Sequence, residues 1–308
     1  MSDQLQKYLF EDQTVRAEVV SIRETWKEIQ ARHDYPSAVQ KLLGELVAAS
    51  ALLAANIKFN GTVVLQLQGD GPIGLIVVEC HADLGMRATV KLREGHAVPD
   101  DGTFQSLLNP HGGGRFSVVL DPQDRLPGQQ PYQGIVALQG ESVAQALEHY
   151  MLASEQLQTR IWLAADTGCA AGVLLQQLPR HGGKATSEPA SVAGDTWERA
   201  QILAETIKSE ELLTLTPDAL IRRLYWQETL RTFEPTAVSY RCTCSREKVA
   251  DVLLRLGREE IDDILAEQGR VQINCDYCVK SFEFDPVDCA ELFANASAKV
   301  RHQSEARH

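Results

Sequence analysis

Two close pairs of cysteines near the carboxy terminus constrain the fold more than any other feature of the sequence. Cys242 and Cys244 form a Cys-x-Cys pair, Cys275 and Cys278 form a Cys-x-x-Cys pair, and 30 residues lie between the pairs. Two such pairs can converge on one tetrahedral cation, and four thiolates favour Zn²⁺. No histidine lies between Cys242 and Cys278. The sequence therefore predicts one all-sulfur zinc site, with no open position for a catalytic water.

The composition is that of an ordinary globular protein with an acidic balance. The 308 residues suffice for one large domain and a smaller one. A net charge of −12 disfavours a broad phosphate-binding surface. The first residues lack the basic-then-apolar order of a signal peptide, and the apolar run Leu46–Ala55 is too short to span a bilayer. We therefore expect a cytoplasmic protein that binds neither nucleic acid nor membrane.

Residues 1–182 show the pattern of a compact α+β domain with a large, mostly antiparallel sheet. Apolar residues recur at helical spacing from Pro36 to about Ala55, which predicts a long central helix, and a second helix is expected over Ser142–Leu157. Strand-like segments surround these helices. They are Val15–Val20, Gly61–Gln68, Ile73–Cys80, Arg87–Leu92, Phe116–Leu120, Ile161–Ala165 and Ala170–Leu178.

Two glycine-rich segments of this domain resemble catalytic motifs without their context. Gly69–Gly74 fits Gly-x-Gly-x-x-Gly, but a β-branched apolar run follows where a nucleotide site needs a helix, so we expect a hairpin. His111–Gly114 resembles a lipase oxyanion loop, but the chain has no Gly-x-Ser-x-Gly elbow. The domain contains no cluster of acids, histidines or nucleophiles typical of a catalytic site, and we expect no enzymatic activity.

Residues 183–236 are predicted to form a helical linker. Its first part, His181–Pro189, is loop-like, and two amphipathic helices follow, the second with Thr216 as N-cap and Pro217 in its first turn. Their apolar faces must lie against a neighbouring core or form a covered interaction surface. The residues proposed for this surface are Trp197, Leu203, Ile207, Leu220, Leu224 and Tyr225.

Residues 237–300 are predicted to form a small zinc-binding domain, followed by a tail at 301–308. Ser245 can cap a helix that ends at Gly257, a second helix covers Glu259–Glu267, and a final helix begins near Pro286. Strand-like segments flank the Cys275–Cys278 turn. A unit of this size is marginal without additional stabilisation, so we expect it to fold only with its metal.

The cysteine tetrad is compatible with an inert structural zinc and with a redox switch. A free thioredoxin-type Cys-x-x-Cys is disfavoured, because no strand–helix context opens at Cys275. Oxidation of Cys275 and Cys278 to a disulfide would remove two ligands, whereas the tighter Cys242–Cys244 ring should be harder to close. Exposed apolar surface would then depend on redox state. Each of the remaining cysteines, Cys80, Cys169 and Cys289, is interpreted as a small buried hydrophobe.

The motifs around these cysteines resemble the redox-regulated 33 kDa chaperonin (heat shock protein 33) family, and the resemblance covers nearly the whole chain. The matching carboxy-terminal segments are Cys242–Glu247, Leu256-Gly257, Glu259-Glu260-Ile261, Cys275-x-x-Cys278 and Phe282-x-Phe284-Asp285. The matching amino-terminal segments are Asp34-Tyr35-Pro36, Leu42-Leu43-Gly44-Glu45, Ile57-Lys58-Phe59 and Leu65–Pro72.

The resemblance implies a cytosolic, ATP-independent holdase that protects thermally unfolding and oxidatively damaged proteins from aggregation. It further implies that the reduced, zinc-bound form is inactive. Oxidation would yield the disulfides Cys242–Cys244 and Cys275–Cys278, release zinc, and unfold the carboxy-terminal domain with part of the linker. The oxidised protein would bind unfolding clients and form homodimers. The chain lacks a Gly-x-x-x-x-Gly-Lys-Ser/Thr phosphate loop, in agreement with ATP independence.

Two other hypotheses remain. A thiol–disulfide oxidoreductase would turn over a disulfide substrate, which a chaperone does not. A nucleic-acid-binding zinc module would use Arg241, Arg246 and Lys248, but nearby acids offset these charges. The acids are Glu247, Asp251, Glu259, Glu260, Asp262 and Asp263.

Overall fold

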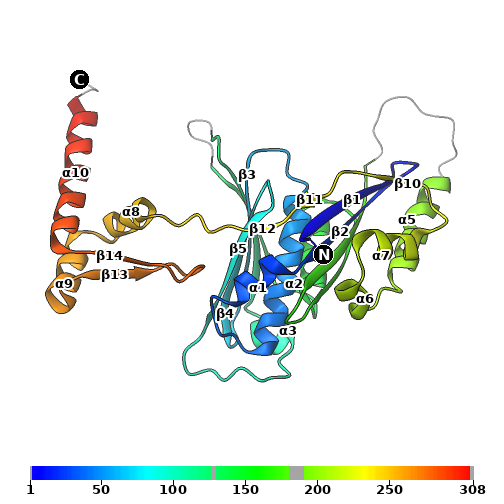
Figure 1. The fold of residues 1–308 in the computed structure, drawn as a ribbon, viewed down its shortest axis with the longest axis horizontal. Helices are drawn as coiled ribbons and strands as arrows, with labels where there is room; N and C mark the ends of the chain where they lie inside the picture. The colour runs from blue at the N-terminus through cyan, green and yellow to red at the C-terminus, as the bar shows by residue number, and fades with distance from the viewer. Residues whose placement is uncertain (1, 126–129, 180–190, 306–308) are drawn as a thin grey trace. The chain divides into compact units, whose positions relative to one another are not determined.

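The computed structural model divides the chain into an N-terminal unit, Met1–Arg241, and a C-terminal unit, Cys242–His308 (Figure 1). It describes residues 2–125, 130–179 and 191–305. The predicted boundary between residues 182 and 183, the loop-like start of the linker through Pro189, and the last three residues of the predicted tail lie outside these ranges. The fold is α+β, as predicted.

The described residues of the N-terminal unit form two sheets. Sheet A has the spatial order β10 (Leu230–Thr232), β1 (Gln4–Phe10), β2 (Val15–Ile22), β9 (Ala170–Gln177) and β8 (Thr159–Ala165), and β11 (Thr236–Ala237) also pairs with β1. Sheet B has the order β12 (Ser239–Tyr240), β5 (Gly85–Leu92), β4 (Ile73–His81), β3 (Gly61–Gln68), β6 (Arg115–Pro122) and β7 (Tyr132–Ala137). Within the described residues, β12–β5 is parallel and the other strand pairs are antiparallel.

The predicted central helix is α2 (Ser37–Ala54), and it packs against strands of both sheets (Figure 1). Its small residues permit this double contact, and one of them, Gly44, lies so close to Trp26 and Ala165 that an added Cβ would collide with them. α2 is long and apolar enough to be a candidate membrane span by length and composition, but 72% of it is buried. It is therefore the core helix of the N-terminal unit. The other helices of this domain are α1 (Glu24–Gln30), α3 (Phe104–Leu108) and α4 (Val143–Glu155).

Sheet A is apolar on both faces, because its central strands alternate between two different cores. In β2, Val20 and Ile22 belong to the core around α2, whereas Val15, Ala17 and Val19 point to the opposite face. In β9 the same alternation explains the continuous apolar run of the sequence. A second layer must therefore cover the outer face of sheet A.

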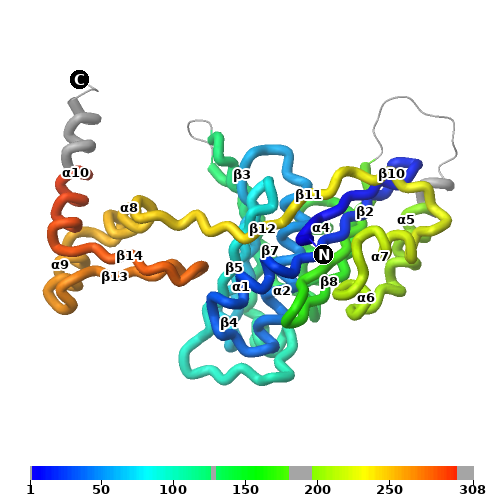
Figure 2. The backbone as a smooth tube through the Cα atoms, in the orientation of Figure 1, coloured from blue at the N-terminus to red at the C-terminus, as the bar shows by residue number. Residues whose placement is uncertain are grey.

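The predicted linker provides this layer with α5 (Ser191–Ala204), α6 (Ser209–Thr214) and α7 (Pro217–Tyr225). Buried residues of these helices form one cluster with the outer face of sheet A. The chain after α7 then extends both sheets, as β10 and β11 run antiparallel along β1 and β12 joins β5 (Figure 2). Because residues 237–241 pair or bond with the N-terminal unit, that unit ends at Arg241, five residues beyond the predicted end of the linker at 236.

The C-terminal unit consists of a two-stranded hairpin and three helices within its described residues. They are α8 (Arg246–Leu256), α9 (Arg258–Gln268), β13 (Val271–Asn274), β14 (Ser281–Phe284) and α10 (Pro286–Glu305). Ser245 accepts the backbone N–H of Lys248 and caps α8, as predicted, and Gly257 and Gly269 end α8 and α9 with positive φ. α10 continues through residues 301–305 of the predicted tail.

Candidate metal centre and the surfaces around it

The sulfur atoms of Cys242, Cys244, Cys275 and Cys278 all lie within 4.8 Å of one another. Cys242 and Cys244 lie in the extended segment before α8, and Cys275 and Cys278 lie in the turn between β13 and β14. Two close sulfur contacts join the segments, at 3.7 Å between the Sγ atoms of Cys242 and Cys275 and 3.4 Å between those of Cys244 and Cys278. The structure thus brings together the four residues that the spacing predicted.

Local hydrogen bonds position the Cys275–Cys278 turn. The backbone N–H of Cys275 donates to the carbonyl of Lys280, and the N–H of Val279 donates to the carbonyl of Cys275, both at 2.9 Å. Val279 adopts the left-handed conformation, with φ of 61°. These bonds tighten the chain reversal, so that both sulfur atoms face the same point.

The donor set fits a tetrahedral zinc ion. Sulfur atoms about 2.3 Å from a tetrahedral Zn²⁺ lie about 3.8 Å apart, close to the Cys242–Cys275 and Cys244–Cys278 separations. Burial, followed by hydrogen bonds to Cys278 and Cys242, raises the pKa of the Cys244 thiol, and burial likewise raises the pKa of Cys275. Four crowded sulfurs ionise together only beside a cation, which their arrangement can bind.

Arg246 connects the two halves of the cysteine cluster. Its guanidinium donates to the backbone carbonyl of Glu283 at 2.6 Å, pairs with Asp288 at 2.7 Å, and lies 4.1 Å from the centre of the Phe284 ring. The sequence showed Arg246 only as a charge near the site. The sequence does contain a signal for the position of its partner Asp288, because Asp285-Pro286-Val287-Asp288 has the spacing of a helix capping box. In the structure the side chains of Asp285 and Asp288 accept each other's backbone N–H groups.

The remaining cysteines lie in three separate cores and are all buried, as interpreted from the sequence. Cys80 belongs to the core around α2, Cys169 to the core between sheet A and the linker, and Cys289 to the small core of the C-terminal unit. Burial raises the pKa of each of the three thiols. They are therefore less reactive than a free cysteine in water.

The six residues proposed for the linker surface face sheet A. Trp197, Leu220, Leu224 and Tyr225 are buried there, while Leu203 and Ile207 are partly buried at the margin of the same cluster. α5 ends at Ala204, so Ile207 follows the helix that was expected to include it. In this structure these residues cover the sheet and are themselves covered by it.

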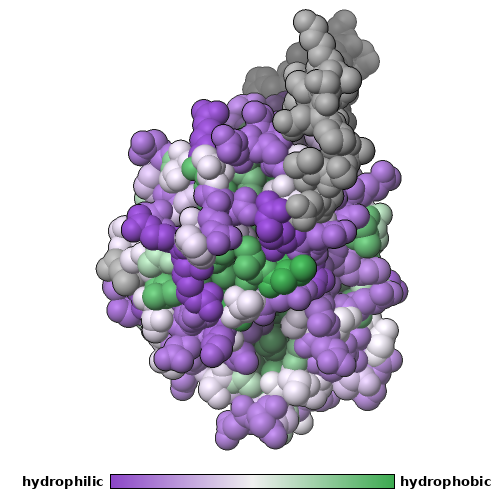
Figure 3. All heavy atoms as spheres, turned by 90° about the vertical axis from the view of Figure 1, so that its right-hand side faces the viewer, coloured by the Kyte–Doolittle hydropathy of each residue, from purple (hydrophilic) through white to green (hydrophobic). Residues whose placement is uncertain are grey.

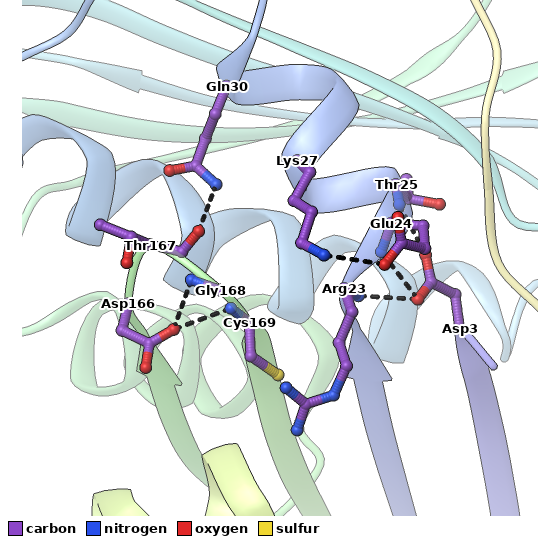
Figure 4. Close-up of polar contacts among 10 residues, drawn as sticks. All are labelled: Asp3, Arg23, Glu24, Thr25, Lys27, Gln30, Asp166, Thr167, Gly168 and Cys169. Carbon is purple, nitrogen blue, oxygen red and sulfur yellow. Dashed lines mark hydrogen bonds and ion pairs between the residues drawn. The ribbon is translucent and has the colours of Figure 1, made fainter. Parts of the chain in front are cut away.

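Polar contacts also attach the linker to sheet A. The hydroxyl of Tyr8 in β1 donates to Asp218 in α7 at 2.7 Å. Arg23, at the start of α1, donates to the backbone carbonyl of Leu213 in α6, and Figure 4 shows its guanidinium beside Cys169. The docked linker therefore combines an apolar interface with specific hydrogen bonds.

The outward side of the linker helices has apolar residues of its own. Figure 3 shows apolar atoms surrounded by polar ones on the side of the molecule where α5–α7 lie. Trp226 is 73% exposed and Ile202 is 65% exposed.

The two glycine-rich motifs contact each other and form turns. The turn Gly69–Pro72 joins β3 to β4, which begins at Ile73 and pairs antiparallel with β3, and this confirms the hairpin and removes the nucleotide interpretation. The carboxylate of Asp70 accepts the backbone N–H of Gly113 at 2.6 Å and of His111 at 3.4 Å. Both segments thus stabilise one end of sheet B.

Comparisons with known proteins agree with the motifs. A family model described as Hsp33 protein matches residues 3–285. The 33 kDa chaperonin of Methylobacillus flagellatus is 44% identical over 294 residues, covering 95% of each chain. That of Ectopseudomonas mendocina is 41% identical over 309 residues, covering 100% of both. The crystal structure of the 33 kDa chaperonin of Thermotoga maritima superposes with a TM-score of 0.77 at 22% identity, covering 96% of this chain and 99% of that one, and supports the fold.

Proposed function

The chain belongs to the Hsp33 protein family, and from this premise we propose that it is an ATP-independent holdase chaperone switched by cysteine oxidation. The observation that supports the switch most directly is the convergence of four cysteine sulfurs within 4.8 Å. Such a cluster can bind a cation when reduced and can form disulfides when oxidised. We further propose that the protein is cytoplasmic, because a reducing compartment keeps the thiols available for metal.

In the reduced form, Cys242, Cys244, Cys275 and Cys278 would bind one Zn²⁺. The ion would supply folding free energy to the C-terminal unit by joining the segment before α8 to the β13–β14 turn. Cys244 and Cys275 also pack against the small core of this unit. The metal site and that core therefore stabilise each other.

Oxidation would remove the ligands. With hydrogen peroxide as oxidant, two thiols lose two electrons and two protons, one S–S bond forms, and the O–O bond is reduced to give two water molecules. All three pairings of the four sulfurs are within reach, because every sulfur lies within 4.8 Å of the others. We propose the pairing of the family resemblance, Cys242–Cys244 and Cys275–Cys278. A sulfur in a disulfide is a poor ligand, so the site would lose its cation and the C-terminal unit its main source of stability.

Unfolding of the C-terminal unit would loosen the linker, because the two are covalently connected at Cys242. Cys242 directly follows Arg241, whose side chain forms a bidentate pair with Asp83 at 2.7 Å beside the short β12–β5 pairing. The exposed Arg241–Asp83 ion pair and the two-residue β12–β5 pairing contribute little free energy to holding this segment in place. Release of the linker would expose Trp197, Leu203, Ile207, Leu220, Leu224 and Tyr225, together with the outer face of sheet A. We propose these surfaces for binding unfolding clients and for homodimer formation.

The test combines metal release, disulfide mapping and chaperone activity on one sample. Peroxide treatment should release one equivalent of zinc to a chromogenic chelator, and peptide mass spectrometry should find the two proposed disulfides. Only the oxidised protein should suppress light scattering by a heat-denatured client without ATP and elute as a dimer. Equal suppression by the reduced, metal-loaded protein would contradict the switch. Catalytic turnover of a disulfide substrate would instead support an oxidoreductase.

A further inference from the structure

A pocket of about 610 Å³ lies within the N-terminal unit, and the proposed chaperone mechanism does not use it. It lies where the first turns of α2 meet the loop before α3, the start of α4, and the turn between β8 and β9. Small-molecule sites typically have volumes of about 300–1,000 Å³. The pocket therefore has the size for an organic ligand.

The charged groups of the pocket are mostly acidic. Among the lining residues that the structure describes, Lys41 is the only base. The acids are Glu45, Asp100, Asp101, Glu141 and Asp166. Asp166 uses one carboxylate oxygen to accept the backbone N–H groups of Gly168 and Cys169, and its second oxygen points away from them (Figure 4).

Glu45 is the group that indicates a ligand. Only 9% of its surface is exposed, and its carboxylate makes no hydrogen bond or close ion pair with a described residue, although the charge of Lys41 acts on it. Two other acids of this unit do have hydrogen-bond donors, since one carboxylate oxygen of Glu18 accepts from Asn56 at 3.1 Å and the half-buried Glu148 accepts from the N–H of Ile161 at 2.7 Å. The Glu45 oxygens are not fully shut off from the pocket, so a cation bound there can reach them and offset the cost of holding a carboxylate in a largely buried position.

The rest of the lining indicates the kind of cation. Apolar side chains of Ala38, Leu42, Phe104 and Ala165 form part of the wall. A bare divalent cation requires several converging oxygen ligands and gains nothing from such a wall. An ammonium or guanidinium group on a short aliphatic chain matches both the acids and the apolar residues.

We propose that this pocket binds a small organic cation, an amine or guanidinium on a short apolar body, with the Glu45 carboxylate as its buried charge partner. Burial raises the pKa of Glu45 to about 7, partly offset by Lys41. Lys41 on the same helix and Asp100, Asp101, Glu141 and Asp166 from other elements line the same pocket. A proton and the ligand would compete for Glu45, so affinity should fall as the pH decreases from 8 to 6.

Titration calorimetry on the reduced, metal-loaded protein tests the proposal with agmatine as probe and 1,4-butanediol as its uncharged counterpart. Agmatine should bind with a stoichiometry of one, and butanediol should not bind. Glu45→Gln should weaken agmatine binding at least tenfold, while Glu94→Gln, an exposed acid outside the pocket, should leave it unchanged.

Thermal melting of the Glu45→Gln protein establishes that it is folded. Absence of agmatine binding, equal affinity in the Glu45→Gln protein, or binding of Ca²⁺ or Mg²⁺ in place of agmatine would each overturn the proposal. These results do not depend on zinc release or chaperone activity.

Discussion

Arg246 shows how one side chain can link separate parts of a small unit. It lies two residues after Cys244, and it contacts Glu283 and Phe284 in the strand that follows the Cys275–Cys278 turn, as well as Asp288 in α10. Both halves of the cysteine cluster therefore depend on its position.

Arg246→Ala should destabilise the C-terminal unit by about 2 kcal/mol, through loss of the cation–π contact with Phe284 and the charged hydrogen bond to the Glu283 carbonyl. Native-state hydrogen exchange of the β13 amides in the reduced, metal-loaded protein measures this change. Arg258→Ala is the matched control, because Arg258 pairs with Asp262 one turn later on an exposed surface. Equal effects of the two substitutions would show that Arg246 is only a surface charge.

Glu45 should make the stability of the N-terminal unit depend on pH. Its folded-state pKa is raised to about 7 by burial, so the folded state binds the proton more tightly than the unfolded state does. Stability should therefore decrease as the pH rises from about 4.5 to about 7 and then level off, by on the order of 3 kcal/mol. Glu45→Gln should raise the melting temperature at pH 8 and have little effect at pH 5. The same shift at both pH values would contradict this.

At the scale of single residues, the sequence predicted those site residues whose role follows from their spacing along the chain. Four thiolates in two close pairs are recognisable as metal ligands because few other structures need that pattern. The importance of Arg246 and Glu45 could not be predicted, since it depends on which groups the tertiary fold places around them. The lack of a partner for a carboxylate is a property of the folded pocket alone.

At the scale of elements, sheet A is the feature that connects fold and function. Its outer face is formed by β1, β2, β8 and β9 and is covered by α5–α7. A sheet with two apolar faces must be covered on both sides or else expose a large hydrophobic surface. The linker is therefore part of the core while docked, and we propose it to be a client-binding surface when released.

Leu220→Ala tests this arrangement. Leu220 in α7 is 1% exposed against sheet A, so its truncation should weaken linker docking by about 3 kcal/mol. Less oxidation should then be required for activity, and the half-time of activation by peroxide should shorten. The measurement is suppression of client light scattering as a function of time after peroxide addition.

Ile202→Ala is the control for Leu220→Ala, because Ile202 lies on the linker helix α5 but is 65% exposed. It should change linker stability by less than about 0.5 kcal/mol and leave the activation half-time as in the unmodified protein. If Leu220→Ala also left the half-time unchanged, release of the linker would not limit activation.

Elements with a strong local pattern were predicted, and elements with a weak one, among them two very short strands with distant partners, were not. α2, α4 and β3–β6 agree with the apolar periodicity within a few residues. The strands β1, β7 and β10–β12 were missed, as were the helices α1, α3 and α6. β10 and β11 have only three and two residues, and they become strands through pairing with β1, more than 200 residues earlier in the chain. No local signal specifies such a pairing.

At the scale of the whole molecule, the two units differ in what stabilises them. The N-terminal unit has two extensive cores. The C-terminal unit has a small buried cluster formed by Val249, Leu253, Ile261, Val271, Phe282, Phe284 and Cys289. So small a core rarely suffices alone, which agrees with the expectation from the sequence that this unit folds only with its metal, and that expectation stays a prediction.

Chelation of the metal from the reduced protein should therefore unfold the C-terminal unit selectively. Structural zinc contributes on the order of 10–16 kcal/mol in small zinc peptides, far more than this core can replace. Hydrogen exchange should show loss of protection in α8, β13 and β14, with protection retained in α2 and in the central strands of both sheets. The same pattern is expected for Cys278→Ser without chelator, because three sulfurs leave the site incomplete.

Chelation also separates the role of the metal from that of the disulfides. If the linker is released only because the C-terminal unit unfolds, the chelated and still reduced protein should suppress client aggregation in proportion to the fraction of exposed α5–α7 amides. If it unfolds but stays inactive, the disulfides themselves must be required to prevent refolding or to position the linker. Retained protection of β13 and β14 after complete metal loss, measured by elemental analysis, would show that the small core is sufficient and that the metal does not control this fold.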